Sequence, residues 1–254
     1  MKAGGFSWIF CSFRAYDIDM KRSYLVCVVA VVVLFVSAVG LCMRALFLPT
    51  SVFAGGNAPI KIVLDAGHGG IDGGVTGITT GVKESDLNLA ITLRLKQTLD
   101  DMGFETVLTR KTEAGLYDAA TEGFKRRDMQ RRKEIVQKAD PTLLISVHQN
   151  RYPSSSVRGA QVFFRRGDFG GERLAFALQE KLNGLYQTEG VKSRKHTPSE
   201  YFMLTCTENP SVIVECGFLS SPADEKLLIS TAWQKRLAES IAAGVVAYLA
   251  GELS

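Results

Sequence analysis

Short runs of apolar, mostly β-branched residues alternate with helical patterns along most of this 254-residue chain. Strands are predicted at Lys61–Ala66, Phe104–Thr109, Thr142–Val147, Gly159–Phe164, Tyr201–Leu204 and Ser211–Val214. Apolar residues at helical spacing predict helices over 87–102, begun by Ser85 as N-cap and stopped by Gly103, and over 124–138, 174–185 and 233–249. Such alternation predicts a single α/β domain with a mostly parallel sheet and helices on both faces.

A stretch of 20 residues without a charge, Tyr24–Met43, precedes this domain. A helix of that length spans about 30 Å, the thickness of the hydrocarbon core of a bilayer. Four basic residues precede the stretch and only Arg44 follows it closely, so the positive-inside rule places the N-terminus in the cytoplasm. We expect a short cytoplasmic N-terminus (1–23), one transmembrane helix as anchor, a linker (44–58) and an extracytoplasmic domain (59–254). A signal peptide cleaved before secretion is the alternative, although its apolar region normally has about 7–15 residues.

The charges of the expected outer domain are nearly balanced. Five Lys/Arg and two Asp/Glu precede Pro59, which leaves 25 and 24 from there to the C-terminus. A nucleic-acid-binding domain would carry a marked basic excess, so the composition argues against that class. Of the five cysteines, only Cys206 and Cys216 belong to this domain, and we expect two buried thiols rather than a disulfide.

Three potentially reactive side chains follow strands of the predicted sheet. His68 comes two residues after the first strand, in the segment IVLDAGHGGIDGG. His148 ends the strand in LLISVHQN, and Glu215 ends the strand in SVIVECGF. Because ligands of open α/β sheets bind at the carboxyl ends of the strands, we expect these three side chains at one rim of the domain.

Histidine and carboxylate side chains at an open site are the ligands of a catalytic zinc ion, which takes three protein ligands and a water. We predict His68, His148 and Glu84 as ligands, because the glycine-rich loop 69–81 can fold Glu84 back toward His68. Zinc lowers the pKa of its water to about 7, and Glu215 would then serve as the general base of a hydrolase. The spacing alone is not specific, since a strand-end histidine is often structural and Glu84 also suits a helix N-terminus.

Five segments occur in the order IVLDAGHGGIDGG, KESDLNLAITLRLKQTL, LLISVHQN, GAQVFF and PSVIVECGFLSSPADEKLL, within residues 59–251. Together they resemble the motifs of the zinc-dependent N-acetylmuramoyl-L-alanine amidases, the amidase-3 family. The resemblance implies zinc (Zn2+) on His68, Glu84 and His148, and catalysis by Glu215. It also implies hydrolysis of the amide between N-acetylmuramic acid and L-alanine in peptidoglycan, a substrate that lies outside the membrane.

The expected anchor, the compact size and the segment SVHQNRYPSSSVRGAQVFF are most similar to the germination-specific members of the family. This similarity implies a role in spore-cortex maturation, where removal of stem peptides leads to muramic-δ-lactam. Some family members carry a helix that plugs the zinc site, but residues 165–170 leave no room for one here. Control would then rest on timing, location or an activating protein partner. A zinc peptidase acting on stem peptides and a non-catalytic wall-binding module are the alternatives.

Other segments have plainer structural interpretations. We expect His196, Arg194 and Lys195 in a solvated loop. The basic run FKRRDMQRRKEIV is expected on the solvated face of a helix, since acidic residues are interspersed in it. Residues 201–203 are expected in the core rather than at a glycan platform. Gln149 and Arg151 stand where the family usually has smaller or apolar residues, which affects the substrate groove but not the metal ligands.

Overall fold

The computed structural model describes residues 28–35, 37 and 60–251. The predicted cytoplasmic segment, the linker and much of the predicted anchor lie outside these residues. Residues 28–35 and 37 are helical. Among the residues described, no helix combines the length and apolar character needed to cross a bilayer.

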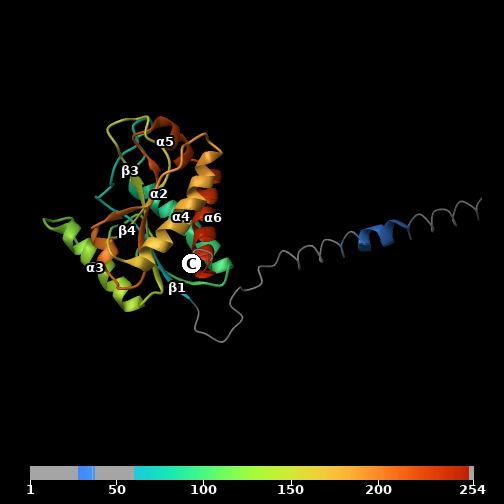
Figure 1. Cartoon of the computed structure of the whole chain (residues 1–254), viewed down its shortest axis with the longest axis horizontal. Coiled ribbons are helices and arrows are strands. Elements are labelled where there is room, and N and C mark those ends of the chain that lie inside the picture. The colour runs from blue at the N-terminus through green and yellow to red at the C-terminus, as the bar shows by residue number, and fades with distance from the viewer. Residues whose placement is uncertain (1–27, 36, 38–59, 252–254) are drawn as a thin grey trace, which may run out of the picture. The chain divides into compact units, whose positions relative to one another are not determined.

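Residues 60–251 form one α/β domain, in which strands and helices alternate (Figure 1). Their order is β1 (Lys61–Ala66), α2 (Glu84–Asp101), β2 (Glu105–Leu108), α3 (Phe124–Ala139), β3 (Leu143–Asn150), β4 (Gln161–Arg165), α4 (Phe169–Gln187), β5 (Thr197–Ser199), the 3₁₀ helix η1 (Phe202–Thr205), β6 (Ser211–Phe218), α5 (Pro222–Leu228) and α6 (Thr231–Leu249). The strands make one sheet in the order β2-β1-β3-β6-β4-β5. Neighbouring strands run parallel except for the antiparallel pair β4 and β6, which confirms the predicted mostly parallel sheet.

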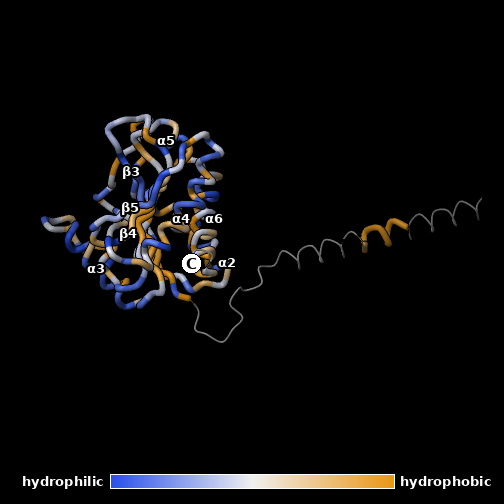
Figure 2. The backbone as a smooth tube through the Cα atoms, in the orientation of Figure 1, coloured by the Kyte–Doolittle hydropathy of each residue, from blue (hydrophilic) through white to orange (hydrophobic). Residues whose placement is uncertain are grey.

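Alternate residues of the strands face two separate hydrophobic layers. On one face, Ile62, Ile145 and Val214 join a core with apolar residues of α2, α4 and α6. On the other face, Val63 and Ile213 pack with residues of α3 and η1. Side chains alternate between the two sides of a strand, so helices cover both faces of the sheet, as predicted. Figure 2 shows the strands at the centre of the domain as largely hydrophobic.

Two local predictions are wrong, and helix α5 was not predicted at all. The expected strand at 201–204 is instead the 3₁₀ helix η1, in which the Leu204 amide donates to the Tyr201 carbonyl, and β5 takes the sheet edge. Helix α5 was not predicted, because seven residues are too short to show a helical period. Ser85 is not the N-cap of α2. Lys83 holds that position without a side-chain hydrogen bond, so the helix begins at Glu84.

Two further predictions are confirmed. Cys206 and Cys216 are both free and buried, so they are structural thiols. Only three residues separate the end of β4 from the start of α4, and no plugging helix can lie between them.

Candidate metal centre

The predicted site residues converge at the carboxyl ends of the central strands. Glu84 Oε1 lies 3.3 Å from His68 Nε2 and 2.9 Å from His148 Nδ1. One ligand atom of each residue lies within 4.8 Å of the others, which is close enough for all three to hold a single ion. Glu215 stands opposite His148 in the register of β3 and β6 and faces the same cleft. Residues far apart in the sequence thus form one constellation.

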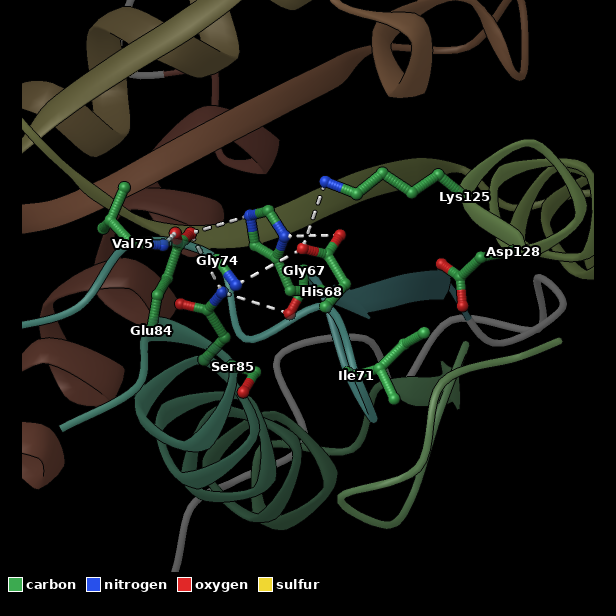
Figure 3. Close-up of polar contacts among 12 residues, drawn as sticks. Gly67, His68, Ile71, Gly74, Val75, Glu84, Ser85, Lys125 and Asp128 are labelled. Atoms are coloured by element: carbon green, nitrogen blue, oxygen red, sulfur yellow. Dashed lines mark hydrogen bonds and ion pairs between the residues drawn. The ribbon is translucent and has the colours of Figure 1, made fainter. Parts of the chain in front are cut away.

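The backbone around His68 explains the glycines of the loop. His68 has φ 61°, a left-handed conformation that costs a residue with a side chain roughly 1–2 kcal/mol. This conformation aims the imidazole at Glu84 instead of continuing β1 (Figure 3). A Cβ added at Gly67 would collide with the ring of His148, so the close approach of the two segments requires glycine there.

Glu84 is the first residue of α2, and a tight set of donors fixes its carboxylate. Its Oε2 accepts a hydrogen bond from the amide of Val75 at 2.8 Å, as Figure 3 shows. Its Oε1 accepts from Asn88 Nδ2 and from the Gln149 amide, both at 3.2 Å. A side chain at Gly74 would strike this carboxylate. The loop predicted to fold Glu84 back therefore does so, and it packs against the carboxylate that it places.

The charges of the site favour a cation where the three ligand atoms meet. Burial alone would lower the pKa of His68, but hydrogen bonds and charge from Glu84 and Asp72 raise it to about 9. Burial would likewise raise the pKa of Glu84, but its hydrogen bonds to the two histidines hold it well below the ordinary value. His68 Nδ1 lies 3.0 Å from Asp72 Oδ2. Metal-bound histidines commonly give their second N–H to a carboxylate in this way, so the donor set fits zinc.

Glu215 differs from the other carboxylates of the site. Burial, its largest influence, raises the pKa of Glu215 to about 7. Its Oε2 is buried and has no hydrogen-bond partner among the described residues. A carboxylate that lines the cleft and has a pKa near neutrality is suited to accept a proton from a water and to return it.

A cleft of about 540 Å³ continues from the metal centre over the face of the sheet covered by α3 and η1. Phe124 and Met129 line it from α3, Phe202 lines it from η1, and Tyr201 lines it from the position just before η1. Tyr201 and Phe202 are 46% and 43% exposed, so the expectation that they lie in the core was wrong. Of residues 201–203 only Met203 is buried. The 3₁₀ turn buries Met203 and leaves its two aromatic neighbours at the rim.

Residues 62–247 match the protein-family model described as N-acetylmuramoyl-L-alanine amidase, Amidase_3. The chain belongs to this family. The germination-specific N-acetylmuramoyl-L-alanine amidase of Bacillus subtilis (strain 168) is 33% identical over 191 residues, which are 74% of this chain and 78% of that protein. AmiA of Escherichia coli (strain K12) is 29% identical over 231 residues, covering 74% of this chain and 75% of AmiA.

Among solved structures, the CwlD amidase from Clostridioides difficile, determined in complex with the GerS lipoprotein, superposes with a TM-score of 0.72 at 32% identity. The superposition covers 76% of this chain and 99% of that one. The chain is thus a hydrolase, an N-acetylmuramoyl-L-alanine amidase, and the similarity to germination-specific members is confirmed.

A buried ionic network that was not predicted lies beside the candidate metal centre. Arg132, assigned to the solvated face of α3, is only 1% exposed and lies 2.6 Å from Asp65 Oδ1 and 2.6 Å from Asp128 Oδ2. Burial would raise the pKa of Asp65, but the Arg132 guanidinium and hydrogen bonds from Ser146 and Thr109 lower it to about 2. The i, i+4 spacing of Asp128 and Arg132 was the available signal, since such pairs share one face of a helix.

The polar segment around His196 lies away from the metal centre. The His196 ring is half-buried, with its centroid 5.6 Å from that of Phe164 and 5.7 Å from that of Phe176, so it is not the solvated loop residue that was expected. Arg194 is also half-buried and donates to Gln161 Oε1 at 2.7 Å. Only Lys195 is exposed as predicted.

The two residues in which the chain departs from the family pattern have different roles. Gln149 is buried and donates to Asn88 Oδ1 at 3.1 Å, so it supports the amide that holds Glu84. Arg151 is exposed and lines the cleft of the amidase. The first departure therefore belongs to the support of the metal centre and the second to the groove.

Proposed function

We propose that this protein is a zinc-dependent amidase in which His68, Glu84 and His148 hold the metal and Glu215 is the catalytic residue. The convergence of three ligand atoms within 4.8 Å beside an unpartnered carboxylate supports this assignment. When bound, zinc supplies a Lewis acid that polarises the scissile carbonyl and lowers the pKa of a water.

Glu215 then carries the proton through the reaction. Its carboxylate accepts the proton of the attacking water, and the carboxyl group later donates it to the departing nitrogen of L-alanine. Burial raises the pKa of Glu215 in the metal-free protein, which makes its carboxylate a stronger base than an exposed glutamate. The hydrogen bonds to Glu84 and the contact between His68 and Asp72 keep the ligand atoms aimed at one point.

We propose spore-cortex peptidoglycan as the substrate, with removal of stem peptides leading to muramic-δ-lactam. The relative from Bacillus subtilis, whose name states that it is germination-specific, supports this choice. An anchor at 24–43 that leaves the catalytic domain on the extracytoplasmic side is also proposed, on the evidence of the uncharged stretch, and secretion after signal cleavage is the alternative.

An activating protein partner is part of the proposal. The CwlD amidase from Clostridioides difficile was solved in complex with the GerS lipoprotein, which supports a protein partner for this chain. The short β4–α4 connection has no plug to be displaced. Regulation by a partner would then act on metal loading or on access to the wall.

The test is product analysis. The full chain, zinc-loaded or treated with a chelator, is incubated with purified cortex and vegetative peptidoglycan, and released fragments are identified by mass spectrometry. Free stem peptides beginning with L-alanine, absent after chelation and with Glu215→Gln, are the expected result. Cleavage within the stem would identify a zinc peptidase instead. No release by a zinc-loaded enzyme, with or without a partner, would favour a wall-binding module.

A further inference from the structure

Two buried arginines converge on the backbone of the His68 loop. Arg132 donates from Nη1 to the Ala66 carbonyl at 2.7 Å and from Nη2 to the His68 carbonyl at 2.6 Å. Arg110 donates from Nε to the same Ala66 carbonyl at 2.8 Å and from Nη2 to the Gly67 carbonyl at 3.0 Å. Three consecutive carbonyls, from residues 66 to 68, therefore accept hydrogen bonds from guanidinium groups.

These hydrogen bonds define the backbone conformation that a metal ligand needs. Consecutive carbonyls of an extended strand point in opposite directions, whereas here the chain bends so that all three reach the same pair of arginines. The bend includes the left-handed φ of His68, which a residue with a side chain does not favour on its own. The arginines satisfy the carbonyls in that conformation and so hold the imidazole toward Glu84.

Arg110 also joins the two segments that carry ligands. The same Nη2 that bonds the Gly67 carbonyl donates to the Ser85 carbonyl at 2.8 Å. Ser85 follows Glu84 at the start of α2, and Figure 3 shows this turn beside the His68 loop. One guanidinium therefore fixes the separation between the His68 loop and the first turn of the helix that carries Glu84.

Carboxylates hold Arg132 in place. Its Nε lies 2.6 Å from Asp128 Oδ2, and its Nη1 lies 2.6 Å from Asp65 Oδ1. Asp65 in turn accepts hydrogen bonds from Thr109 and Ser146. A planar guanidinium held by two carboxylates has its remaining donors directed at fixed points, which a lysine ammonium does not reproduce.

We propose that Arg110 and Arg132 are positioning residues that preform the metal centre by clamping carbonyls 66–68 and tying them to the start of α2. The inference rests on the zinc site proposed above. A positioning role of the two arginines differs from that of a purely structural ion pair in one consequence. A structural pair stabilises the fold with or without metal, whereas a positioning pair sets how tightly the folded protein binds zinc.

The experiment measures zinc affinity of the full chain by competition with a chromophoric chelator, at a temperature where circular dichroism shows each variant folded. Arg132→Met is expected to weaken zinc binding by about 10–100-fold, the range typical of residues that orient metal ligands. Arg131→Met is the matched control, because Arg131 is the preceding residue of α3 and is exposed, and its one ion pair among the described residues is with Asp118, at 3.5 Å. It is expected to bind zinc as the wild type does.

A second readout records ligand geometry without turnover. The visible spectrum of the cobalt-substituted protein reports the coordination of the ion, and Arg132→Met is expected to shift and broaden it. Arg132→Lys keeps the positive charge beside Asp65 but lacks the planar set of guanidinium donors. We expect its zinc affinity to lie between those of the wild type and Arg132→Met. If Arg132→Met does not fold, the lysine variant and Arg110→Lys carry the test.

The outcomes separate the two proposals. Unchanged zinc affinity and an unchanged cobalt spectrum in the folded Arg132 and Arg110 variants would overturn the positioning role and leave the zinc site standing. A wild-type protein that binds no zinc would instead overturn the proposed function. Variants that lose stability equally with and without metal, at constant affinity, would identify a structural ion pair.

Discussion

Replacing Glu215 by glutamine should make the metal-free protein more stable at alkaline pH while it abolishes turnover. Burial raises the pKa of Glu215 from 4.5 to about 7. The unfolded chain therefore loses this proton near pH 4.5, whereas the folded protein keeps it until about pH 7. In that window the folded state binds more protons, so the free energy of unfolding falls as pH rises.

The size of the effect follows from the same pKa values. Each pKa unit corresponds to about 1.4 kcal/mol, so the ionised Glu215 lowers the free energy of unfolding by about 3 kcal/mol above pH 7, with no cost below pH 4.5. Glutamine is neutral at every pH and avoids this loss. The stability difference between Glu215→Gln and wild type should therefore grow by about 3 kcal/mol in favour of the variant from pH 4.5 to pH 8.

Urea unfolding of the chelator-treated protein at several pH values measures this difference. Other titrating groups occur in both proteins, so their contributions cancel to a first approximation. Any pH-independent effect of the amide, including an unsatisfied N–H, appears equally at both ends of the range. A difference that stays constant between pH 4.5 and 8, or that grows in favour of wild type, would refute the reasoning that Glu215 is buried at an energetic cost. Zinc must be absent, because a nearby dication would lower the pKa of the carboxylate.

Three other substitutions test the site. Gly67→Ala should weaken zinc binding by more than about 100-fold because its Cβ displaces the His148 ring, and a zinc affinity equal to that of the wild type in the chelator competition would contradict this. His148→Ala should lose both metal and activity, and an unchanged metal content by atomic absorption would show that the ligand set is wrong. Phe202→Ala should lower kcat/KM on peptidoglycan by about fivefold through a lost aromatic contact, whereas Phe169→Ala, an exposed phenylalanine outside the cleft, should have no effect. Equal values for the two phenylalanine variants would exclude η1 from substrate binding.

The strand ends could be predicted because the sequence carries their pattern directly. Buried strands such as β1 and β3 appear in the sequence as mostly apolar runs. A parallel sheet brings the carboxyl ends of such strands to one edge, independently of the loops that connect them. That rule alone was enough to group His68, His148 and Glu215. The prediction that Glu84 is a ligand depended on the glycine-rich loop and on the family resemblance. Glu84 follows His68 by 16 residues, and that separation alone does not require the two side chains to be in contact.

The positions that could not be predicted depend on tertiary contacts. The apolar residues 201–204 suit a buried strand as well as a buried turn, so their composition does not decide between the two. The edge of the sheet is occupied by β5, and the hydrophobic layer that buries Met203 stabilises the turn. In α3 charged residues occur all round the helix, so the i, i+4 spacing of Asp128 and Arg132 indicates a pair but does not show that the pair faces inward. Arg132 is buried because Asp65 and the carbonyls of the His68 loop satisfy its guanidinium, and those partners lie more than 60 residues away.

Two groups of the metal-free site, His68 and Glu215, have raised pKa values, and a dication bound beside them would lower both. Asp72 contacts Nδ1 of His68 and Glu84 contacts Nε2, and the two carboxylates together raise the pKa of the ring. Glu215 resists ionisation because burial disfavours its charge and no donor reaches its Oε2. Zinc would displace the proton of His68 and make loss of the Glu215 proton easier, because it supplies the positive charge that the carboxylates lack. The proposed zinc ion would therefore relieve the cost of burying Glu215 and would stabilise the folded protein as any ligand of the native state does.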